Sequence, residues 1–150
     1  MGTARDIITN LGVLLNSSGV GVWNTTGAFQ PTDTAVVAEA MPPTPDRAIV
    51  LTTFPLTQIA GSTTGRWILQ VRTRGLPNEV LDCVDLTDQV KTVIDGLTNQ
   101  LWGNTAVSQV IFYSSIPMGV DDSVRFEHVT KYYVDLDEPP TPLRPAGGWD

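Results

Sequence analysis

The first apolar pattern along the chain has helical spacing. Between residues 3 and 18, apolar side chains recur at every third or fourth position, which places them on one stripe of a helix. The stripe contains Ala4, Ile7, Ile8, Leu11, Leu14 and Leu15. Thr3 and Asp6 resemble a capping box at its start, and Gly19 can adopt the left-handed conformation that ends many helices. The pattern predicts a helix between Thr3 and Gly19.

Strand-like patterns occupy the middle of the chain. Residues 48–53 and 67–74 are rich in side chains that suit a pleated surface, and the polar, glycine-containing residues 54–65 are expected to connect them as a long loop. Alternation in the second segment puts one set on the core face: Trp67, Leu69, Val71 and Thr73. The opposite face carries Ile68, Gln70, Arg72 and Arg74. We therefore expect a hairpin whose arginine face is left available for contacts.

Shorter segments precede this hairpin. Residues 20–23 form an apolar strand candidate, followed by a Thr-, Gly- and Pro-rich loop over residues 24–33. Residues 35–41 fit either a strand or a helical turn. The prolines that follow end the element in either case, because proline lacks the backbone donor and restricts its predecessor.

A second amphipathic helix is expected after residues 75–78, with Asn78 as its N-cap. Its apolar stripe consists of Cys83, Leu86, Val90, Ile94 and Leu97. The helix is expected to reach Leu101 and Trp102 and to end near Gly103.

The last predicted hairpin pairs residues 106–114 with residues 124–136. The second of these segments alternates cleanly, so that Tyr132, Val134 and Leu136 face one way while Glu127 and Asp135 face the other. Such alternation is typical of an antiparallel sheet with one covered face.

The order of elements predicts an α+β fold, with two helices packed on an antiparallel β-sheet of about four to five strands. We expect a single domain over residues 1–137. Residues 138–150 contain prolines and glycines that prevent a helix or a ladder, so an extended C-terminal arm is expected there. Trp149 in this arm belongs either to a disordered tail or to a segment that docks on a neighbouring molecule.

Composition narrows the function. The length of 150 residues and 41% hydrophobic content fit one core. Nine Lys and Arg against 16 Asp and Glu give a net charge of −7, which disfavours conventional DNA binding. The single cysteine, Cys83, cannot form an intrachain disulfide, and the start resembles a capped helix more than a secretory signal, so a cytoplasmic compartment is expected. No apolar run approaches the roughly 18 residues that a membrane span needs.

The charges are unevenly distributed. Residues 47–78 contain four arginines and no acid, whereas residues 79–95 contain five acids and only one basic residue, Lys91. Both regions fit ordinary solvated faces, and they also fit electrostatic matching between neighbouring copies of the chain. In the second interpretation the subunit interface includes Arg66, Arg72, Arg74, Glu79, Asp82, Asp85 and Asp88.

No complete catalytic motif is present. Residues 61–66 superficially resemble a phosphate-binding loop, but they lack a lysine and lead into a strand, so a hairpin loop is the better interpretation. Asp33 in an Asp-Thr-Ala run resembles half of an aspartic-protease site, whose second carboxylate a homodimer would have to supply. The alternative for Asp33 is a turn-capping residue.

The sequence predicts no metal or cofactor site. His128 is the only histidine, and without clustered cysteines or a second histidine it falls short of a structural metal site. We expect it to be a hydrogen-bonded core or interface residue. Cys83 could pair with it as a nucleophile, but its place on the apolar helix stripe favours a small buried core residue.

Three runs occur in order along the chain: MPPTPDRAIVLTT (residues 41–53), VRTRGLPNE (71–79) ahead of the acidic helix, and KYYVDLD (131–137). Together they resemble the minor capsid or tail-terminator proteins of long, non-contractile-tailed bacteriophages that infect actinobacteria. The resemblance covers roughly residues 3–137.

This resemblance implies a structural subunit of the virion neck, assembled in the host cytoplasm. Six such subunits would form a ring on the head-proximal end of the tail tube, stop tube polymerisation and bind the head-completion connector, with genomic DNA passing through the centre. Under this interpretation, contacts to the tube or connector are expected from Phe54, Leu56, Gln58, Ile59 and Trp149. The alternatives are a head-completion or neck adaptor protein and a dimeric aspartic hydrolase that uses Asp33.

Overall fold

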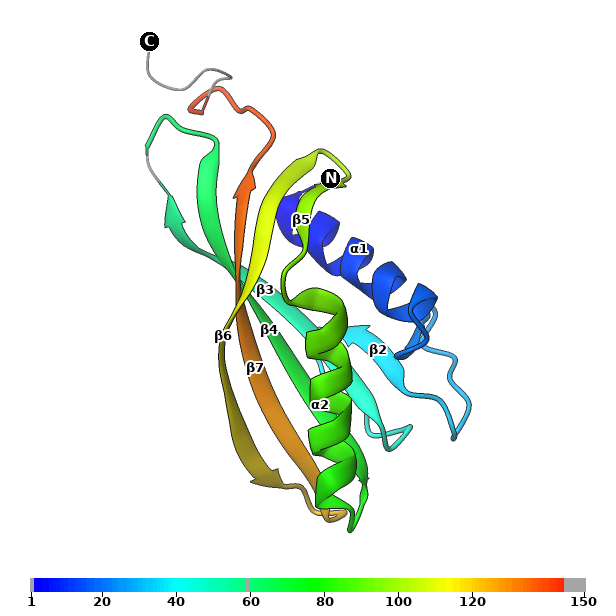
Figure 1. Ribbon diagram of the computed structural model, residues 1–150. Helices are drawn as coiled ribbons and strands as arrows, with labels where there is room; N and C mark the ends of the chain where they lie inside the picture. Colours follow the sequence, from blue (N-terminus) through cyan, green and yellow to red (C-terminus); the bar gives the residue numbers. More distant parts are fainter. Residues whose placement is uncertain (1, 59, 145–150) are drawn as a thin grey trace.

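The computed structural model describes residues 2–58 and 60–144, which form two helices and seven strands (Figure 1). In chain order these are α1 (Thr3–Ser17), β1 (Val22–Trp23), β2 (Ala35–Ala38), β3 (Ala48–Gln58), β4 (Thr64–Pro77), α2 (Val80–Ile94), β5 (Thr98–Trp102), β6 (Thr105–Val120) and β7 (Arg125–Asp137). The strands form one sheet in the order β1-β2-β3-β4-β7-β6-β5. Neither helix is long and apolar enough to span a membrane.

The sheet is mixed. β1 pairs with β2, and β2 with β3, in parallel, while all other neighbouring strands are antiparallel. The predicted α+β class with two helices is confirmed, but the prediction of an antiparallel sheet of about four to five strands was wrong. The strands β1 and β2 are only 2 and 4 residues long, too short to show an alternation, and β2 is held by its pairing with the start of β3.

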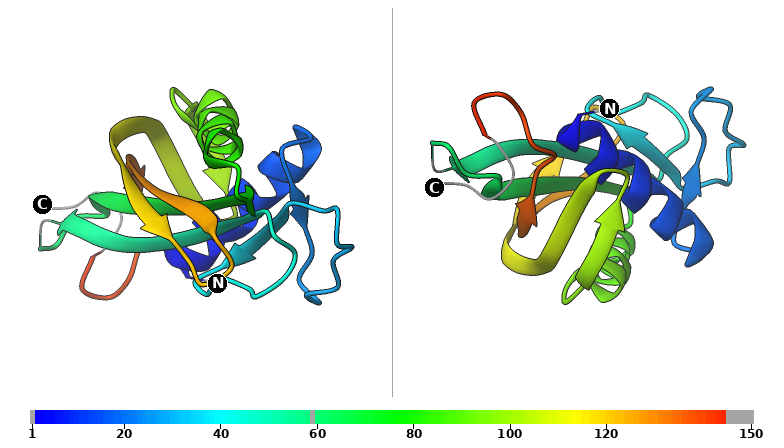
Figure 2. Two further views of the ribbon diagram at one scale, coloured as in Figure 1. Left: turned by 90° about the horizontal axis from the view of Figure 1, so that it is seen from below. Right: turned by 90° about the horizontal axis from the view of Figure 1, so that it is seen from above.

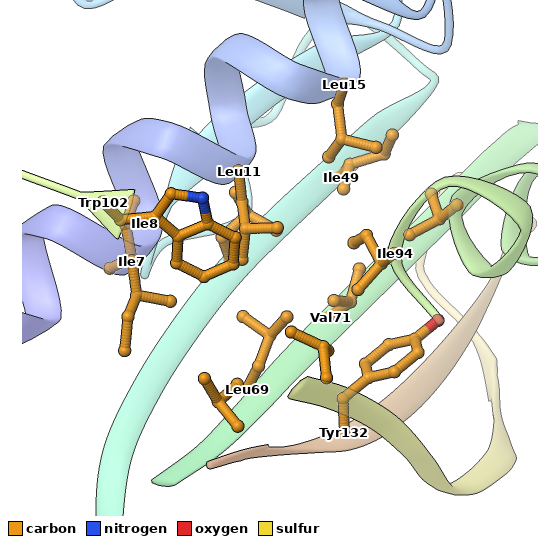
Figure 3. Packing of buried hydrophobic residues seen from close by; sticks show 14 of the residues in the cluster. Ile7, Ile8, Leu11, Leu15, Ile49, Leu69, Val71, Ile94, Trp102 and Tyr132 are labelled. Carbon is orange, nitrogen blue, oxygen red and sulfur yellow. The ribbon is translucent and has the colours of Figure 1, made fainter. Parts of the chain in front are cut away.

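The sheet curves into a half-barrel, and both helices pack on the same face of it (Figures 1 and 2). α1 lies over β1 to β3, and α2 lies over β4 and β7. Between the layers, Leu11, Ile49, Leu69, Ile94 and Tyr132 are fully buried (Figure 3). Burial of each such aliphatic side chain contributes about 1.5–3 kcal/mol, so this shared core is what fixes the helices on the sheet.

The predicted start of α1 is right, but its predicted capping box is wrong. Gly2 is the N-cap and no side chain caps the helix. The carboxylate of Asp6 instead accepts hydrogen bonds from the Thr105 hydroxyl (3.1 Å) and the Asn104 backbone N–H (3.4 Å) at the start of β6. A contact distant in sequence therefore replaces the local cap. At the other end, Gly19 has the expected left-handed conformation, with φ of +77°.

The helix α2 begins and ends differently from the prediction. Its N-cap is Glu79, and Asn78 precedes it with φ of +62°. It ends at Ile94, because Gly96 adopts φ of +90° and the Leu97 carbonyl accepts a hydrogen bond from Val110 N–H at 2.8 Å. Leu97 continues the helical spacing by sequence but begins the approach to β5.

The central strands are longer than their apolar patterns. β4 pairs with β7 from Thr64↔Asp137 to Pro77↔Arg125, and β3 follows β4 as far as Gln58. The predicted long loop over residues 54–65 was therefore wrong, and only residues 59–63 connect the two strands. The last hairpin is confirmed, and its first strand extends past Ser114 to Val120.

The first part of the predicted C-terminal arm folds back on the β3–β4 hairpin. Glu138 N–H donates to Thr63 O (2.8 Å), and the Arg144 guanidinium donates to Ser62 O (3.0 Å). Thr141 and Arg144 form a β-bridge with each other, so this stretch is a turn. Trp149 lies outside the described residues.

Candidate functional site

The turn between β4 and α2 is organised by one carboxylate. Asp82 accepts two hydrogen bonds from the Arg47 guanidinium, one from Nε at 2.9 Å, and another from Leu76 N–H at 2.8 Å. The bond from Arg47 is the main reason why the pKa of Asp82 lies below its usual value. Gly75 is required here because an added Cβ would lie 2.7 Å from Cys83 N. Asp82 thus holds the acidic helix against the start of β3.

The uncovered face of the sheet carries a polar ladder. Arg66 on β4 donates to both carboxylate oxygens of Asp135 on β7, at 2.7 and 3.0 Å, and Gln109 on β6 donates to Asp135 at 2.7 Å. The Arg66 guanidinium also lies 4.3 Å from the ring centroid of Tyr133, which stacks on Tyr113 at 4.6 Å. Side chains of three neighbouring strands therefore interact within the subunit on this face.

The other arginines of β4 also have partners within the subunit. Arg72 pairs with Glu127 on β7. Arg74 is only 2% exposed and donates to the carbonyls of Asp46 (2.8 Å) and Pro45 (2.7 Å). Burial is the main cause that lowers the pKa of Arg74. Of the two arginines expected on the available face, Arg74 is buried, whereas Arg72 stays exposed while it pairs within the subunit.

The sequence did contain a signal for these pairs. Alternation along β7 places Glu127 and Asp135 on one face, and alternation along β4 places Arg66 and Arg72 on a matching face. What the sequence lacks is the strand order, which makes β4 and β7 direct neighbours. Without that order, acids more than fifty residues away could not be assigned to the arginines.

The exposed acids of the predicted interface all lie on or beside α2. Glu79, Asp85 and Asp88 are exposed, and no described basic side chain forms an ion pair with them. Beside them, Leu81 is 69% exposed, and this end of α2 and Arg47 together line a shallow hollow of about 580 Å³. The predicted interface residues therefore fall into two groups: the arginines and Asp82, which are paired, and three outward acids.

Three of the predicted tube or connector contacts, Phe54, Leu56 and Gln58, lie on β3. Phe54 and Leu56 are exposed, at 41% and 51%, whereas Gln58 donates a hydrogen bond to Glu138. Ile59 and Trp149 lie outside the described residues, so the structure does not place them.

The candidate catalytic residues occupy structural positions. The Asp33 carboxylate accepts a hydrogen bond from Gln30 N–H at 2.7 Å, as a turn-capping residue does. Cys83 is fully buried, its thiol lies 3.6 Å from Thr73 O, and burial raises its pKa, which opposes formation of a reactive thiolate. His128 is half-buried, and its Nδ1 has no hydrogen-bond partner among the described residues, contrary to the expectation of a hydrogen-bonded histidine.

Sequence reasoning missed the second half of β6. Tyr113, Ile116, Met118 and Val120 are each more than half exposed on a strand that was expected to stop at Ser114. The signal for a longer strand was that residues 109–120 contain no charged residue. A proline and a glycine interrupt the strand-like pattern in this stretch and obscure that signal. This strand carries the densest group of exposed apolar side chains in the part of the chain that the structure describes.

Comparison with known proteins gives two results. A family model described as "Bacteriophage tail terminator protein" matches residues 14–138. A chain from a solved structure, "Virion of native gene transfer agent (GTA) particle", is similar with a TM-score of 0.56 at 11% identity, over 89% of this chain and 95% of that chain. At this identity the likeness shows the fold alone. No curated protein matches the sequence. The family match covers most of the chain, including the sheet and α2 but only the end of α1, and the protein therefore belongs to the bacteriophage tail terminator protein family.

Proposed function

We propose that this protein is the ring-forming subunit that caps the head-proximal end of a phage tail tube. The observation that supports it most strongly is the family match over residues 14–138. In this role the ring stops polymerisation of the tube and then binds the head-completion connector at the virion neck. The family is structural, and the proposed role requires no catalysis.

A ring imposes a requirement that this subunit can meet. Identical copies related by rotation contact one another through two different patches, each of which must be complementary to the other. We propose a ring of six copies. The half-barrel offers distinct surfaces at its two edges and on its helical layer, as the views in Figure 2 show.

The outward acids of α2 are assigned to a different protein of the tail. Arg47, Arg66 and Arg72 are already paired with acids of their own subunit. In a second copy these three arginines are therefore less free to bind Asp85 and Asp88. We propose that these acids, together with exposed Leu81, contact a basic surface of the tail-tube or connector protein, where charge complementarity would favour docking and set its orientation.

The proposed passage of DNA agrees with the charge of the chain. A net charge of −7 per subunit gives a ring a strongly negative total charge. Such a ring repels phosphate groups and forms no adhesive contacts with the duplex, so DNA can slide through it without sequence-specific binding.

The function is tested by the native mass of the purified chain, alone and with purified tail-tube protein. The proposal predicts a closed ring that binds the end of tubes. A ring that binds only the connector protein would favour a neck adaptor. An Asp33-dependent hydrolytic activity, lost in Asp33→Asn, would favour the dimeric hydrolase.

A further inference from the structure

Besides the edge strands β1 and β5, residues 52–58 of β3 and residues 113–120 of β6 have a neighbouring strand on one side only. The pairing of β2 with β3 ends at Leu51. On the other side of the sheet, β5 and the loop before it form hydrogen bonds with the backbone of β6 only as far as Phe112, whose N–H donates to Asp95 at 2.8 Å. Within the described residues, nothing pairs with the outer side of residues 52–58 of β3 or of residues 113–120 of β6. The second stretch forms the lower left edge of the sheet in Figure 1.

Neither edge carries the usual protection against pairing. Exposed edge strands are commonly guarded by charged side chains, lysine above all, because unpaired backbone groups are a template for another strand. Charged residues make up 17% of this chain, yet residues 52–58 and 113–120 contain none. Each has one proline, Pro55 and Pro117, which removes a single backbone donor.

Both edges also present exposed apolar side chains. Phe54 and Leu56 are 41% and 51% exposed on β3, and Ile116 and Met118 are 54% and 53% exposed on β6. Covering such side chains contributes about 25 cal/mol for each Å² removed from water, in addition to the hydrogen bonds that a paired edge gains. Pairing of either edge with a partner strand is therefore more favourable than leaving that edge exposed to water.

The relative placement of the edges suits a second copy of this chain. β3 and β6 run in opposite directions, because three antiparallel pairings separate them. Across the sheet, Gln58 pairs with Gly65, Gly65 with Leu136, and Leu136 with Val107. The unpaired part of β3 therefore lies level with the start of β6, far from Val120. The two unpaired stretches thus lie on opposite edges and toward opposite ends, and closing a sheet into a ring needs this kind of stagger.

We propose that residues 52–58 of one copy pair in antiparallel fashion with residues 113–120 of the next copy, so that the sheet continues from subunit to subunit. This inference rests on the proposed ring and names its contact. Copies with a net charge of −7 repel one another, and a contact made through two uncharged strands brings the fewest like charges together.

The test uses two full-length variants, each with a lysine on one edge: Leu56→Lys on β3 and Ile116→Lys on β6. Val13→Lys on the exposed side of α1 is the matched control, because Val13 and Ile116 are equally exposed at 54%. Thermal unfolding of each variant establishes that the subunit still folds, and native mass spectrometry measures assembly. We expect the control to form the wild-type ring and each edge variant to remain monomeric.

Mixing the two edge variants gives the sharper result. Each keeps one intact edge, so an equal mixture is expected to form 1:1 dimers and nothing larger. Self-dimers of Leu56→Lys alone would show that β6 pairs with β6 of another copy and would overturn the proposal. Rings of normal mass from either single variant, or a wild-type chain that stays monomeric up to its solubility limit, would also overturn it.

Failure of this contact is distinguishable from failure of the proposed function. If the edge variants still form rings that cap tubes, only the contact is wrong. If the wild-type ring forms through these edges but leaves tube growth unchanged, the contact is right and the terminator function is wrong.

Discussion

Arg47 and Asp82, 35 residues apart in the sequence, form a two-point ion pair that ties the start of β3 to the first turn of α2. Asp82 is the more enclosed partner, with 14% of its side chain exposed against 39% for Arg47. The same carboxylate accepts the Leu76 N–H, so one side chain fixes both the turn and the helix.

Replacing Asp82 by Asn is expected to lower the free energy of unfolding by about 1–2 kcal/mol at neutral pH, because the amide cannot accept both guanidinium bonds. The effect should depend on pH. The folded-state pKa of Asp82 is lowered, so its contribution is present above the unfolded pKa of about 4 and is lost as the pH falls through the folded value. Urea unfolding of both proteins at pH 7 and pH 3 measures this, and Asp88→Asn, an exposed neutralisation on the same helix, is the control. An equal deficit at both pH values would contradict the assignment.

Arg72 and Arg74 are predicted to differ sharply although both lie on the same face of β4. Arg74→Gln should lower the free energy of unfolding by about 3 kcal/mol, since it leaves the carbonyl groups of Pro45 and Asp46 without their hydrogen-bond donor. Arg72→Gln should lower the free energy of unfolding by about 1 kcal/mol, because the Arg72 side chain is 44% exposed. In this variant Glu127 still has the positive charge of Arg74 close to it. Urea unfolding of the two variants gives the comparison. Equal losses would show that burial does not set the difference.

A comparison of two glycines with positive φ distinguishes the effect of backbone strain from the effect of steric contact. Gly103 and Gly119 have φ of +61° and +84°. Replacement of either by Ala should lower the free energy of unfolding by about 1–2 kcal/mol, because a residue with a Cβ is strained at positive φ. A Cβ at Gly103 would also meet the buried Asp6 carboxylate, whereas one at Gly119 meets nothing within 4 Å. Thermal and urea unfolding should therefore show a larger loss for Gly103→Ala. A loss no greater than that of Gly119→Ala would mean that Asp6 moves freely.

The Tyr132 hydroxyl is buried beneath α2 and has no hydrogen-bond partner among residues 2–58 and 60–144. Burial also raises the pKa of Tyr132. Tyr132→Phe removes an unpaired polar atom while it keeps the ring, so stability should stay unchanged or rise by up to about 1 kcal/mol. Tyr133→Phe on the opposite face is the control. A measured loss above about 1 kcal/mol would reveal a partner for the hydroxyl.

The core could be predicted from the sequence, whereas the edges of the fold could not. Periodicity identified α1 and the apolar faces of β4 and β7, because alternation and helical spacing report directly which side chains are buried. It missed β5, since Leu97 and Leu101 continue the spacing of α2 and only the φ of Gly96 separates the two elements. It also shortened β3 and β6, whose last residues are shaped by neighbouring strands rather than by a buried face.

The candidate site shows the same division. The sequence identified the segregated charges, and the exposed acids of α2 are where it placed them. It could not show that Arg66 and Arg72 meet Asp135 and Glu127, because that depends on strand order. The family resemblance is confirmed, and the host group of the phage stays a prediction.

We propose that this subunit ends tube growth as a ring. Electron microscopy of polymerising tail-tube protein, with and without the purified chain, measures tube length and the occupancy of tube ends. Added chain is expected to shorten the tubes, with a ring at one end of each. An unchanged length distribution, with no ring at either end, would contradict it.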